Sequence, residues 1–301
     1  MRSLYAIIGH PVGHSLSPRF QQAALDNAGI DAAYLPFDIP PEDLSRGVEA
    51  LRTLKASGFN VTIPHKEAIL PLLDDLSPTA REIGAVNTVI ARDGRLTGEN
   101  TDGPGFLGAM ERFLAANGLS TPSSVVIFGA GGSAKAVLWA LPKLGAERIL
   151  IVNRTKKRGE DLLGLLPTGK IRVQAAALDD PEWRTELPRA SPSLFVNTLS
   201  LSAYTGSAHP FPPLAEMLLD GAILYDLSYA SHRPGSALLA GRTPFLEAGA
   251  PFRLPCQNGL GMLLLQGALS FELWTGQGAP VEAMESALKE GTRQKEFWKT
   301  L

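Results

Sequence analysis

SVVIFGAGGSA, residues 124–134, joins an apolar run to a glycine-rich turn and determines the architecture of half the chain. The apolar residues 125–128 predict a strand buried on both faces, and a helix is expected from Lys135 to Leu144. Between a strand and a helix, G-x-G-x-x-A is the pattern of a dinucleotide-binding turn. Its first glycine makes the tight turn, its second lets a pyrophosphate approach the helix N-terminus, and the alanine permits close packing. We therefore predict a dinucleotide site made by Gly129, Ala130, Gly131, Gly132, Ser133 and Ala134.

The residues after the next strand indicate which dinucleotide is bound. A strand is expected at Arg148–Val152, and an NAD site usually has an acidic residue near the end of this strand. Here there is no acid, and basic residues follow. Two arginines could hold the 2′-phosphate of NADP, although a solvated basic helix start would have the same composition. We predict NADP, bound by Asn153, Arg154, Thr155 and Arg158.

The rest of this half continues the alternation of strands and helices. Such alternation predicts a doubly wound parallel sheet, the Rossmann fold, with further strands at 171–174, 194–198 and 222–226. Two polar stretches, 197–200 and 226–229, stand just past strand ends, where ligands bind in such sheets. We interpret Trp183, in an expected loop, as a packing residue.

The first half of the chain is also α/β. Strands are expected at 4–8 and 33–37, and helices at 19–28 and 41–56. The loop after the first strand carries Ser15 and Ser17, two hydroxyls that could bind one small anion. Alternatively, Ser17 only caps the helix that begins at Pro18.

Asn60-Val61-Thr62-Ile63-Pro64-His65-Lys66 indicates a strand that leads into a helix expected from Pro64 to about Leu73. Proline suits the first helical position, which places Lys66 in the first turn. The helix dipole disfavours a cation there, so a lysine held in this way can exchange protons near neutral pH. The alternative is an ordinary surface lysine.

Asp93-Gly94 predicts a two-residue turn between strands at 85–91 and 95–100. The turn sets the register, so that Asn87 lies opposite Asn100, with Asp102 a diagonal neighbour on the same face. An amide and a carboxylate should therefore meet, with Thr101 adjacent. Alternatively, Asp102 only caps a helix expected around 106–116.

One amide, Gln266, interrupts an otherwise apolar helix expected at 260–274. A buried amide needs hydrogen-bond partners. Its partner is either a ligand or the backbone of another helix.

Composition limits the class of protein. The chain has 301 residues, enough for two domains, and is 45% apolar and 19% charged. A net charge of −2 and a pI near 6.2 give no bulk attraction to nucleic acid or to an anionic membrane. The single cysteine, Cys256, excludes an internal disulfide and a multi-cysteine metal site. No apolar run has the length of a signal peptide core or a membrane span, so we expect a cytoplasmic protein.

Taken together, the motifs resemble the shikimate dehydrogenase family over nearly the whole chain. The matching segments are HSLSP (14–18), NVTIPHK (60–66), GAVNT (84–88), GENTD (98–102), GAGGSA (129–134), NRT (153–155) and GLGMLLLQ (259–266). The resemblance implies an N-terminal α/β substrate-binding domain, to which C-terminal helices return, and a Rossmann NADP-binding domain. The first would comprise 1–102 with 257–301 and the second 103–256, with the active site in the cleft between them.

The resemblance also implies an activity and roles for residues. The reaction would be the NADPH-dependent, reversible reduction of 3-dehydroshikimate to shikimate in aromatic amino acid biosynthesis. Lys66 and Asp102 match the catalytic pair, and no metal is required because nicotinamide carries the hydride. The substrate carboxylate would bind Ser15 and Ser17, and the rest of the substrate would contact Thr62, Asn87, Thr101, Tyr229 and Gln266. The cofactor would also contact Thr198, Leu227 and Gly259.

The chain departs from the family pattern at four places. Gln21-Gln22 replaces His-Asn, and Asn258 stands where Asp is common. Ser202-Ala203 replaces Gly-Met, and residues 228–231 replace a Val-Tyr-Asn-Pro-like run, of which only the tyrosine is kept. These two changes put the shape of the nicotinamide pocket in question. None of these changes alters the lysine–aspartate pair.

Two other readings remain open. The chain could be a relative that acts on quinate or on an aminated shikimate. Ser17 in place of a bulkier threonine leaves room consistent with shikimate, but one methyl group in a pocket discriminates weakly. It could also be an inactive NADP-binding regulator, although such a protein would be free to lose Lys66 or Asp102. The expected partners are small molecules, and the expected state is a monomer or a homodimer.

Overall fold

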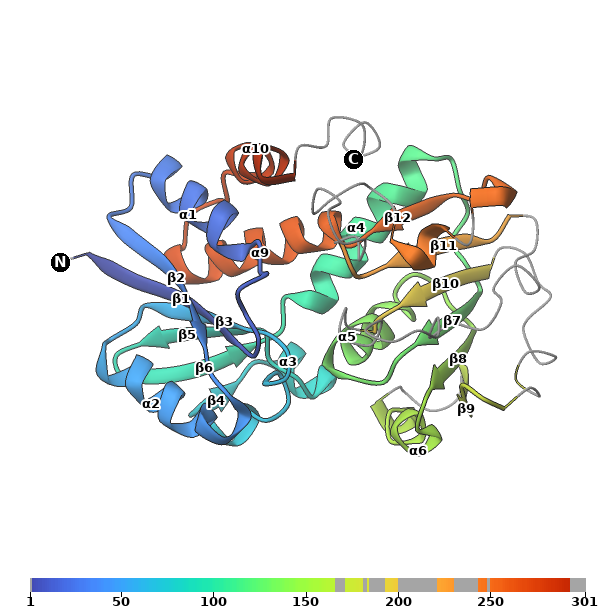
Figure 1. Cartoon of the computed structure of the whole chain (residues 1–301), viewed down its shortest axis with the longest axis horizontal. Coiled ribbons are helices and arrows are strands. Elements are labelled where there is room, and N and C mark those ends of the chain that lie inside the picture. The colour runs from blue at the N-terminus through green and yellow to red at the C-terminus, as the bar shows by residue number, and fades with distance from the viewer. Residues whose placement is uncertain are drawn as a thin grey trace. The chain divides into compact units, whose positions relative to one another are not determined.

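The computed structural model shows an α/β chain that divides into two compact units (Figure 1). It describes residues 2–165, 171–180, 183, 193–199, 221–229, 243–247 and 250–292. The first unit contains Met1–Gly105 and Leu263–Gly291, and the second contains Phe106–Met262. Within the described residues, every helix is too short or too polar to cross a membrane.

The first unit is built on a mixed sheet of six strands in the order β2-β1-β3-β5-β6-β4. Strands β2, β1 and β3 are parallel, whereas β5 runs antiparallel to both of its neighbours. The strand bounds are β1 Ser3–Gly9, β2 Ala32–Asp38, β3 Gly58–Val61, β4 Asp75–Leu76, β5 Thr88–Arg92 and β6 Arg95–Glu99. The strands expected in this half are confirmed, and β4 was not predicted.

Helices cover both faces of this sheet. α2 packs on one face through Leu44, Val48 and Leu51, which share an apolar core with β1 and β3. α9 lies along the other face, where the ring of Trp274 packs 5.2 Å from that of Tyr5 (Figure 1). The helix bounds are α1 Ser17–Asn27, α2 Leu44–Thr53, α3 Pro78–Ile83, α9 Leu260–Thr275 and α10 Val281–Thr292, with 3₁₀ turns at Pro41–Asp43 and Leu70–Leu72.

The second unit contains a sheet of six parallel strands in the order β12-β11-β10-β7-β8-β9. Numbered from β7, this is the strand order of a Rossmann fold, so the predicted fold class is confirmed. The bounds are β7 Ser124–Phe128, β8 Arg148–Asn153, β9 Arg172–Ala177, β10 Ser193–Asn197, β11 Ile223–Asp226 and β12 Cys256–Asn258. The short and largely polar β12 has no apolar periodicity and was not predicted.

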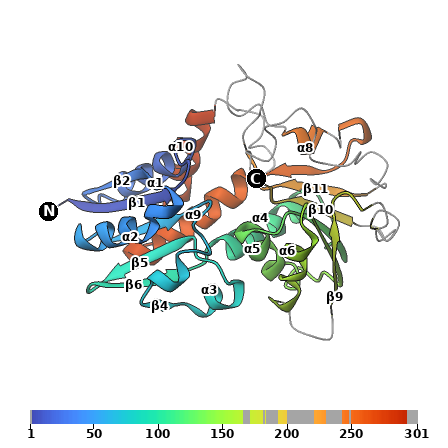
Figure 2. The same ribbon diagram turned by 60° about the horizontal axis from the view of Figure 1, so that its bottom comes forward.

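α5 and α6 lie on one face of this sheet, and α8 lies on the other (Figure 2). On the α8 face, Phe245 packs against Phe128, and Trp183 joins the same core, which confirms its role in packing. The bounds are α5 Gly132–Ala140, α6 Lys156–Glu160 and α8 Pro244–Glu247, with 3₁₀ turns at Leu163–Leu165 and Ala250–Phe252. α4, Asp102–Ala116, begins in the first unit and continues into the second.

Candidate active site

Polar residues from the end of the hairpin meet in the first unit. Both residues of the Asp93-Gly94 turn have positive φ, 51° and 77°, as a type I′ turn requires. β5 and β6 pair in the expected register. Just beyond them, Asn87 Nδ2 lies 2.9 Å from Thr101 Oγ1 and 3.0 Å from Asp102 Oδ1. The prediction that the hairpin gathers an amide and a carboxylate is confirmed.

Asp102 is the first residue of α4, where the helix dipole stabilises a negative charge. Its role is not that of a simple cap. The side chain of Asn100 caps this helix instead, because its Oδ1 accepts a hydrogen bond from the Gly103 N–H at 3.2 Å. The Asp102 carboxylate is therefore available to Asn87 and to Lys66.

Lys66 reaches that carboxylate from a turn, so the predicted helix from Pro64 is wrong. Residues 62–65 form a turn closed by a backbone hydrogen bond of 2.9 Å between its ends, and the peptide bond before Pro64 is cis. The Lys66 carbonyl accepts a hydrogen bond from the Val86 N–H at 2.8 Å, and residues 66–69 form a turn instead of a helix. The argument that a helix dipole acts on Lys66 does not hold.

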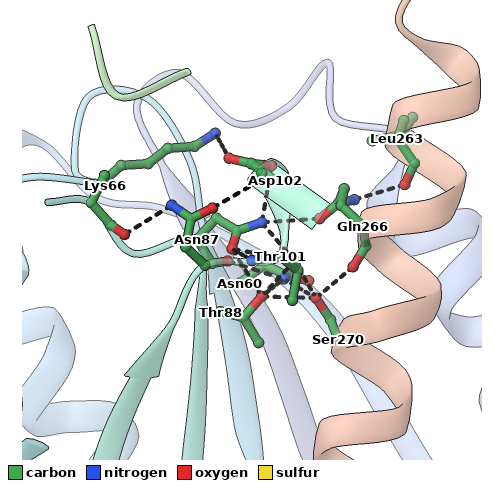
Figure 3. A network of polar contacts seen from close by, with 12 residues as sticks. Asn60, Lys66, Asn87, Thr88, Thr101, Asp102, Leu263, Gln266 and Ser270 are labelled. Atoms are coloured by element: carbon green, nitrogen blue, oxygen red, sulfur yellow. Dashed lines mark hydrogen bonds and ion pairs between the residues drawn. The ribbon is translucent and has the colours of Figure 1, made fainter. Parts of the chain in front are cut away.

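The lysine and the aspartate form a largely buried ion pair (Figure 3). Lys66 Nζ lies 2.6 Å from Asp102 Oδ2, and only 13% and 8% of the two side chains are exposed. Water screens such a pair much less than it screens a surface pair, so the attraction between the charges is strong. Lys66 is therefore not an ordinary surface lysine.

Gln266 joins this group from α9 (Figure 3). Its Oε1 accepts a hydrogen bond from Asn87 Nδ2 at 3.2 Å, and its Nε2 donates to the Leu263 carbonyl of its own helix at 2.7 Å. The amide thus finds a side-chain partner on the hairpin and a backbone partner one turn back. The expectation that this amide needs polar partners is confirmed, but the backbone partner belongs to its own helix and not, as the alternative to a ligand had it, to another helix.

Three further residues, not predicted as site residues, complete the network. Ser270 Oγ lies 2.8 Å from Thr88 Oγ1 and 3.2 Å from Thr101 Oγ1. Asn60 Nδ2 donates to Ser270 Oγ at 3.1 Å and to Thr88 Oγ1 at 3.1 Å. Ser270 stands four residues after Gln266, on the same helix face, so helical spacing was a usable signal for it. For Thr88, the pairing was visible only in the structure.

The serine loop belongs to the same unit. Ser17 is buried at the first position of α1, and its side chain makes no capping hydrogen bond, so the alternative of a simple cap is wrong. Instead, Ser15 Oγ accepts a hydrogen bond from the Ser17 N–H at 3.3 Å. Thr62 is half-buried, and its side chain has no hydrogen bond with the described residues.

Gln21 and Gln22, which depart from the family pattern, both have structural partners. Gln21 Nε2 donates to the Gly267 carbonyl at 2.9 Å and so ties α1 to α9. Gln22 accepts from the Tyr34 N–H at 2.9 Å and donates to the Ala32 carbonyl at 3.2 Å, on strand β2. The replacement of His-Asn by Gln21-Gln22 therefore affects packing behind the serine loop.

The glycine-rich turn in the second unit has the expected geometry. Gly129 has φ 110°, and a Cβ atom there would lie 2.4 Å from Thr198 Oγ1. Gly131 precedes the first residue of α5, and nothing lies within 4 Å of the position of a Cβ atom on it. Ala134 is fully buried. The open space at a helix N-terminus, beside buried packing, fits a pyrophosphate.

The predicted NADP-selective residues follow β8. Asn153 Nδ2 donates to the Thr155 carbonyl at 2.9 Å, which shapes the start of α6. Arg154 and Arg158 are exposed, and neither guanidinium has an ion pair with the described residues. Two guanidinium groups without an ion pair among the described residues, in the unit that carries the dinucleotide-binding turn, are suited to bind a phosphate ester.

The other predicted cofactor residues stand at the ends of β10, β11 and β12. The Leu227 N–H donates to the Asn197 carbonyl at 2.9 Å. A Cβ atom on Gly259 would lie 1.9 Å from the Leu227 carbonyl oxygen, so the two backbones approach each other as only glycine allows. Tyr229 is half-buried and belongs to the second unit. Ser202-Ala203 and residues 230–231 lie outside the described residues.

A buried carboxyl group supports these strand ends. Asp226 Oδ1 accepts hydrogen bonds from Asn197 Nδ2 at 2.7 Å and from the Ser228 N–H at 2.9 Å. Burial raises the pKa of Asp226 to about 6, and hydrogen bonds from Thr243, Ser228 and Asn197 oppose the rise without cancelling it.

A Rossmann unit with a phosphate-binding turn, in one chain with a buried lysine–aspartate pair, defines a dinucleotide-dependent oxidoreductase. Residues 7–89 match the model of the shikimate dehydrogenase substrate binding domain, and residues 259–289 match that of the shikimate 5′-dehydrogenase C-terminal domain. The chain is 42% identical to shikimate dehydrogenase (NADP(+)) of Methanopyrus kandleri, over 97% of this chain and 96% of that protein. This chain belongs to the shikimate dehydrogenase family.

Two solved structures are also similar. Shikimate 5-dehydrogenase from Thermus thermophilus, in complex with NADP(H) and shikimate, has a TM-score of 0.77 and 36% identity, covering 96% of this chain and 99% of that one. Quinate dehydrogenase from Corynebacterium glutamicum, in complex with NAD, has a TM-score of 0.80 and 26% identity, covering 96% of this chain and 99% of that one. The backbone is thus shared by enzymes with different substrates, and the fold alone does not define the substrate.

Proposed function

We propose that this chain catalyses the NADP-dependent, reversible reduction of 3-dehydroshikimate to shikimate, and that Lys66 and Asp102 handle the proton. The observation that carries the role of this pair is the distance of 2.6 Å between Lys66 Nζ and Asp102 Oδ2 in a largely buried setting. Relatives about 40% identical that are named shikimate dehydrogenase (NADP(+)) support the choice of reaction.

The ion pair suits the proton transfer that this reduction requires. When bound, NADPH would supply a hydride to the carbonyl carbon, and the carbonyl oxygen would then need a proton. Lys66 donates that proton from Nζ, and it accepts the proton in the reverse direction. Asp102 also orients the ammonium group, because its other oxygen is held by Asn87 at 3.0 Å.

The residues around the pair suit a substrate with several hydroxyl groups. We assign Asn87, Thr101 and Gln266 to the ring hydroxyls, together with Thr62 and Tyr229. Ser15 and Ser17 would bind the carboxylate. An amide or hydroxyl lining rejects ligands that leave it unpaired, because each buried group without a partner carries a free-energy penalty.

The second unit would hold the cofactor. The open position beside Gly131 receives the pyrophosphate, and Arg154 and Arg158 bind the 2′-phosphate. We thus propose substrate binding by the first unit and NADP binding by the second. A cytoplasmic location and a monomeric or homodimeric state remain predictions.

Steady-state assays test this proposal directly. Purified protein is assayed with shikimate or quinate, each with NADP⁺ or NAD⁺, and we expect turnover mainly with shikimate and NADP⁺. Preference for quinate or NAD⁺ would contradict the assignment. Absence of all activity in folded protein that binds NADP⁺ would favour a regulator.

A variant tests the role of the lysine. Lys66→Ala should lower turnover at least about 100-fold, as expected for loss of a general acid, and should leave NADP⁺ binding intact. The control is Lys289→Ala, which removes a lysine that pairs with Glu285 on α10 and whose side chain is 42% exposed. Normal turnover in Lys66→Ala would disprove the proposed mechanism.

A further inference from the structure

The first turn of α4 meets α9 at a glycine. Gly105 is buried, and its backbone N–H donates to the Thr101 carbonyl at 2.9 Å, one helical turn back. A Cβ atom on Gly105 would lie 2.8 Å from the Cβ of Gln266, 2.9 Å from its backbone N and 3.0 Å from its Cα. The φ angle of Gly105 is not positive, so the requirement for glycine is one of space and not of backbone conformation. The two helices therefore approach each other as closely as a hydrogen side chain allows.

The hydrogen bond from Asn87 to Gln266 is the weakest one that the Asn87 amide donates. Asn87 Oδ1 accepts from the Thr101 N–H at 2.7 Å, so the other end of the amide is the NH₂ group. This Nδ2 has two protons for three acceptors. They are Thr101 Oγ1 at 2.9 Å, Asp102 Oδ1 at 3.0 Å and Gln266 Oε1 at 3.2 Å (Figure 3). Because the bond to Gln266 is the longest, it is the first to be lost if α9 moves away.

Gly105→Ala would separate the two helices by more than this bond tolerates. Atoms in ordinary contact lie about 3.5 Å apart or more, so relief of the crowding against Gln266 requires a shift of about half an ångström. Two of the three crowded atoms are backbone, so a rotamer change does not relieve the contact. The Gln266 amide moves with its helix, because its Nε2 donates to the Leu263 carbonyl at 2.7 Å. The shift would take the bond to Asn87 beyond hydrogen-bond range.

We propose that Gly105 is a positioning residue that sets how far the Gln266 amide reaches into the substrate site, and so how tightly the substrate is held. The inference rests on the proposed function, in which Gln266 contacts a ring hydroxyl. With the amide withdrawn, that hydroxyl loses a partner. The Lys66–Asp102 pair, at 2.6 Å, forms without α9 and anchors the start of α4, so proton transfer to bound substrate is preserved.

Gly47 provides a matched control in the same unit. It is half-buried on α2, and a Cβ atom on it would lie 2.5 Å from Ile39 Cδ1, closer than any atom at Gly105. That neighbour is the end of a flexible side chain, and α2 packs on the opposite face of the sheet from α9. Gly47→Ala therefore makes the same chemical change without moving α9. In both variants the higher helix propensity of alanine opposes the cost of crowding, so we expect both to fold.

The first test compares steady-state constants of Gly105→Ala and Gly47→Ala with those of the wild type, and urea unfolding checks that both variants fold. For Gly105→Ala we expect the KM for shikimate to rise about 5- to 10-fold, the effect of one lost hydrogen bond in a binding site. We expect kcat and the KM for NADP⁺ to change less than about 2-fold, and Gly47→Ala to leave all three near wild type. An unchanged KM for shikimate in Gly105→Ala, or an equal rise in both variants, would overturn the inference.

A double-mutant cycle shows whether Gly105 acts through the amide. Gln266→Ala removes the amide but keeps the Cβ and backbone atoms that Gly105 faces, so the crowding is the same in both backgrounds. The effects of Gly105→Ala and Gln266→Ala on KM should then not multiply, and multiplicative effects would contradict the proposed role. Gln266→Asn draws the amide back by one methylene with Gly105 unchanged, and it should raise the KM similarly. If Gly105→Ala did not fold, an unchanged KM in Gln266→Asn would still overturn the inference.

A crystal structure of Gly105→Ala provides a measurement that does not depend on the reaction. We expect the distance between Asn87 Nδ2 and Gln266 Oε1 to exceed about 3.5 Å. A distance still at 3.2 Å would overturn the inference alone. Wild-type protein that is inactive with shikimate and NADP⁺ would instead overturn the proposed function, and with it the substrate that this inference assigns to the amide.

Discussion

Asp102→Asn is the substitution that tests the central ion pair most directly. It keeps the shape of the side chain and removes its charge. In the native structure each carboxylate oxygen has its own donor, Lys66 Nζ at 2.6 Å from Oδ2 and Asn87 Nδ2 at 3.0 Å from Oδ1. An amide offers one oxygen and one NH₂ group, so one of these two donors must face another donor.

The structure sets the expected magnitude. A hydrogen bond to a charged group contributes about 1.5–3 kcal/mol, and removal of one partner of a buried ion pair costs about 3–5 kcal/mol. With both side chains less than one-seventh exposed (13% and 8%), the buried case applies. If the transition state loses about 3 kcal/mol of this stabilisation, kcat falls about 100-fold. The free energy of unfolding should fall by a similar amount.

The assay is reduction of NADP⁺ by shikimate, measured together with urea unfolding. Asp43→Asn is the control, because Asp43 pairs with Arg46 at 3.0 Å on the surface, with side chains 45% and 86% exposed. Breaking that pair should cost less than about 1 kcal/mol and leave kcat unchanged. If Asp102→Asn retained kcat within about threefold of the wild type, the pair would have no part in proton transfer, and the reasoning from burial would be refuted.

Two further predictions concern the second unit. Arg154→Ala should raise the KM for NADP⁺ at least about 10-fold, because the proposed contact with the 2′-phosphate would be lost, and should barely change the KM for NAD⁺. Equal effects in parallel assays would remove the basis for an NADP site. For Asp226, the pKa is about 6 in the folded chain against an ordinary value of 3.8, so the folded state holds the proton more tightly. Wild-type stability should therefore fall as the pH rises from about 4 to 6, by on the order of 3 kcal/mol, and level off above that. Asp226→Asn, whose amide oxygen can accept both hydrogen bonds, should lose this decline in urea unfolding at pH 4–8, and an unchanged pH profile would contradict the origin of the shift.

Predictions from local pattern succeeded where the geometry is set by neighbours in the chain. The Asp93-Gly94 turn defines a register, and the register alone brings Asn87 next to Thr101 and Asp102. The glycine pattern at 129–134 similarly implies a turn whose φ value and packing follow from the residues themselves.

The prediction for Lys66 failed because a distant partner controls its backbone. Proline followed by polar residues is typical of a helix start, but the Lys66 carbonyl pairs with Val86, twenty positions along the chain. The pairing of Lys66 with Asp102 is nevertheless present. The side chain reaches its partner from a different backbone conformation than the one predicted.

The amino-acid sequence alone determined the fold class, the dinucleotide-binding turn, the hairpin and the residue types of the site, because these depend on periodicity and on short-range backbone preferences. Only the tertiary structure decided which side chains from distant elements share hydrogen bonds. Tyr34, Asn60 and Ser270 come from β2, β3 and α9, and their contacts cross 26 to 210 positions of sequence. Local pattern contains no information about such contacts. The packing of the sheet against α9 brings these three residues together, and their buried polar atoms then form hydrogen bonds with one another.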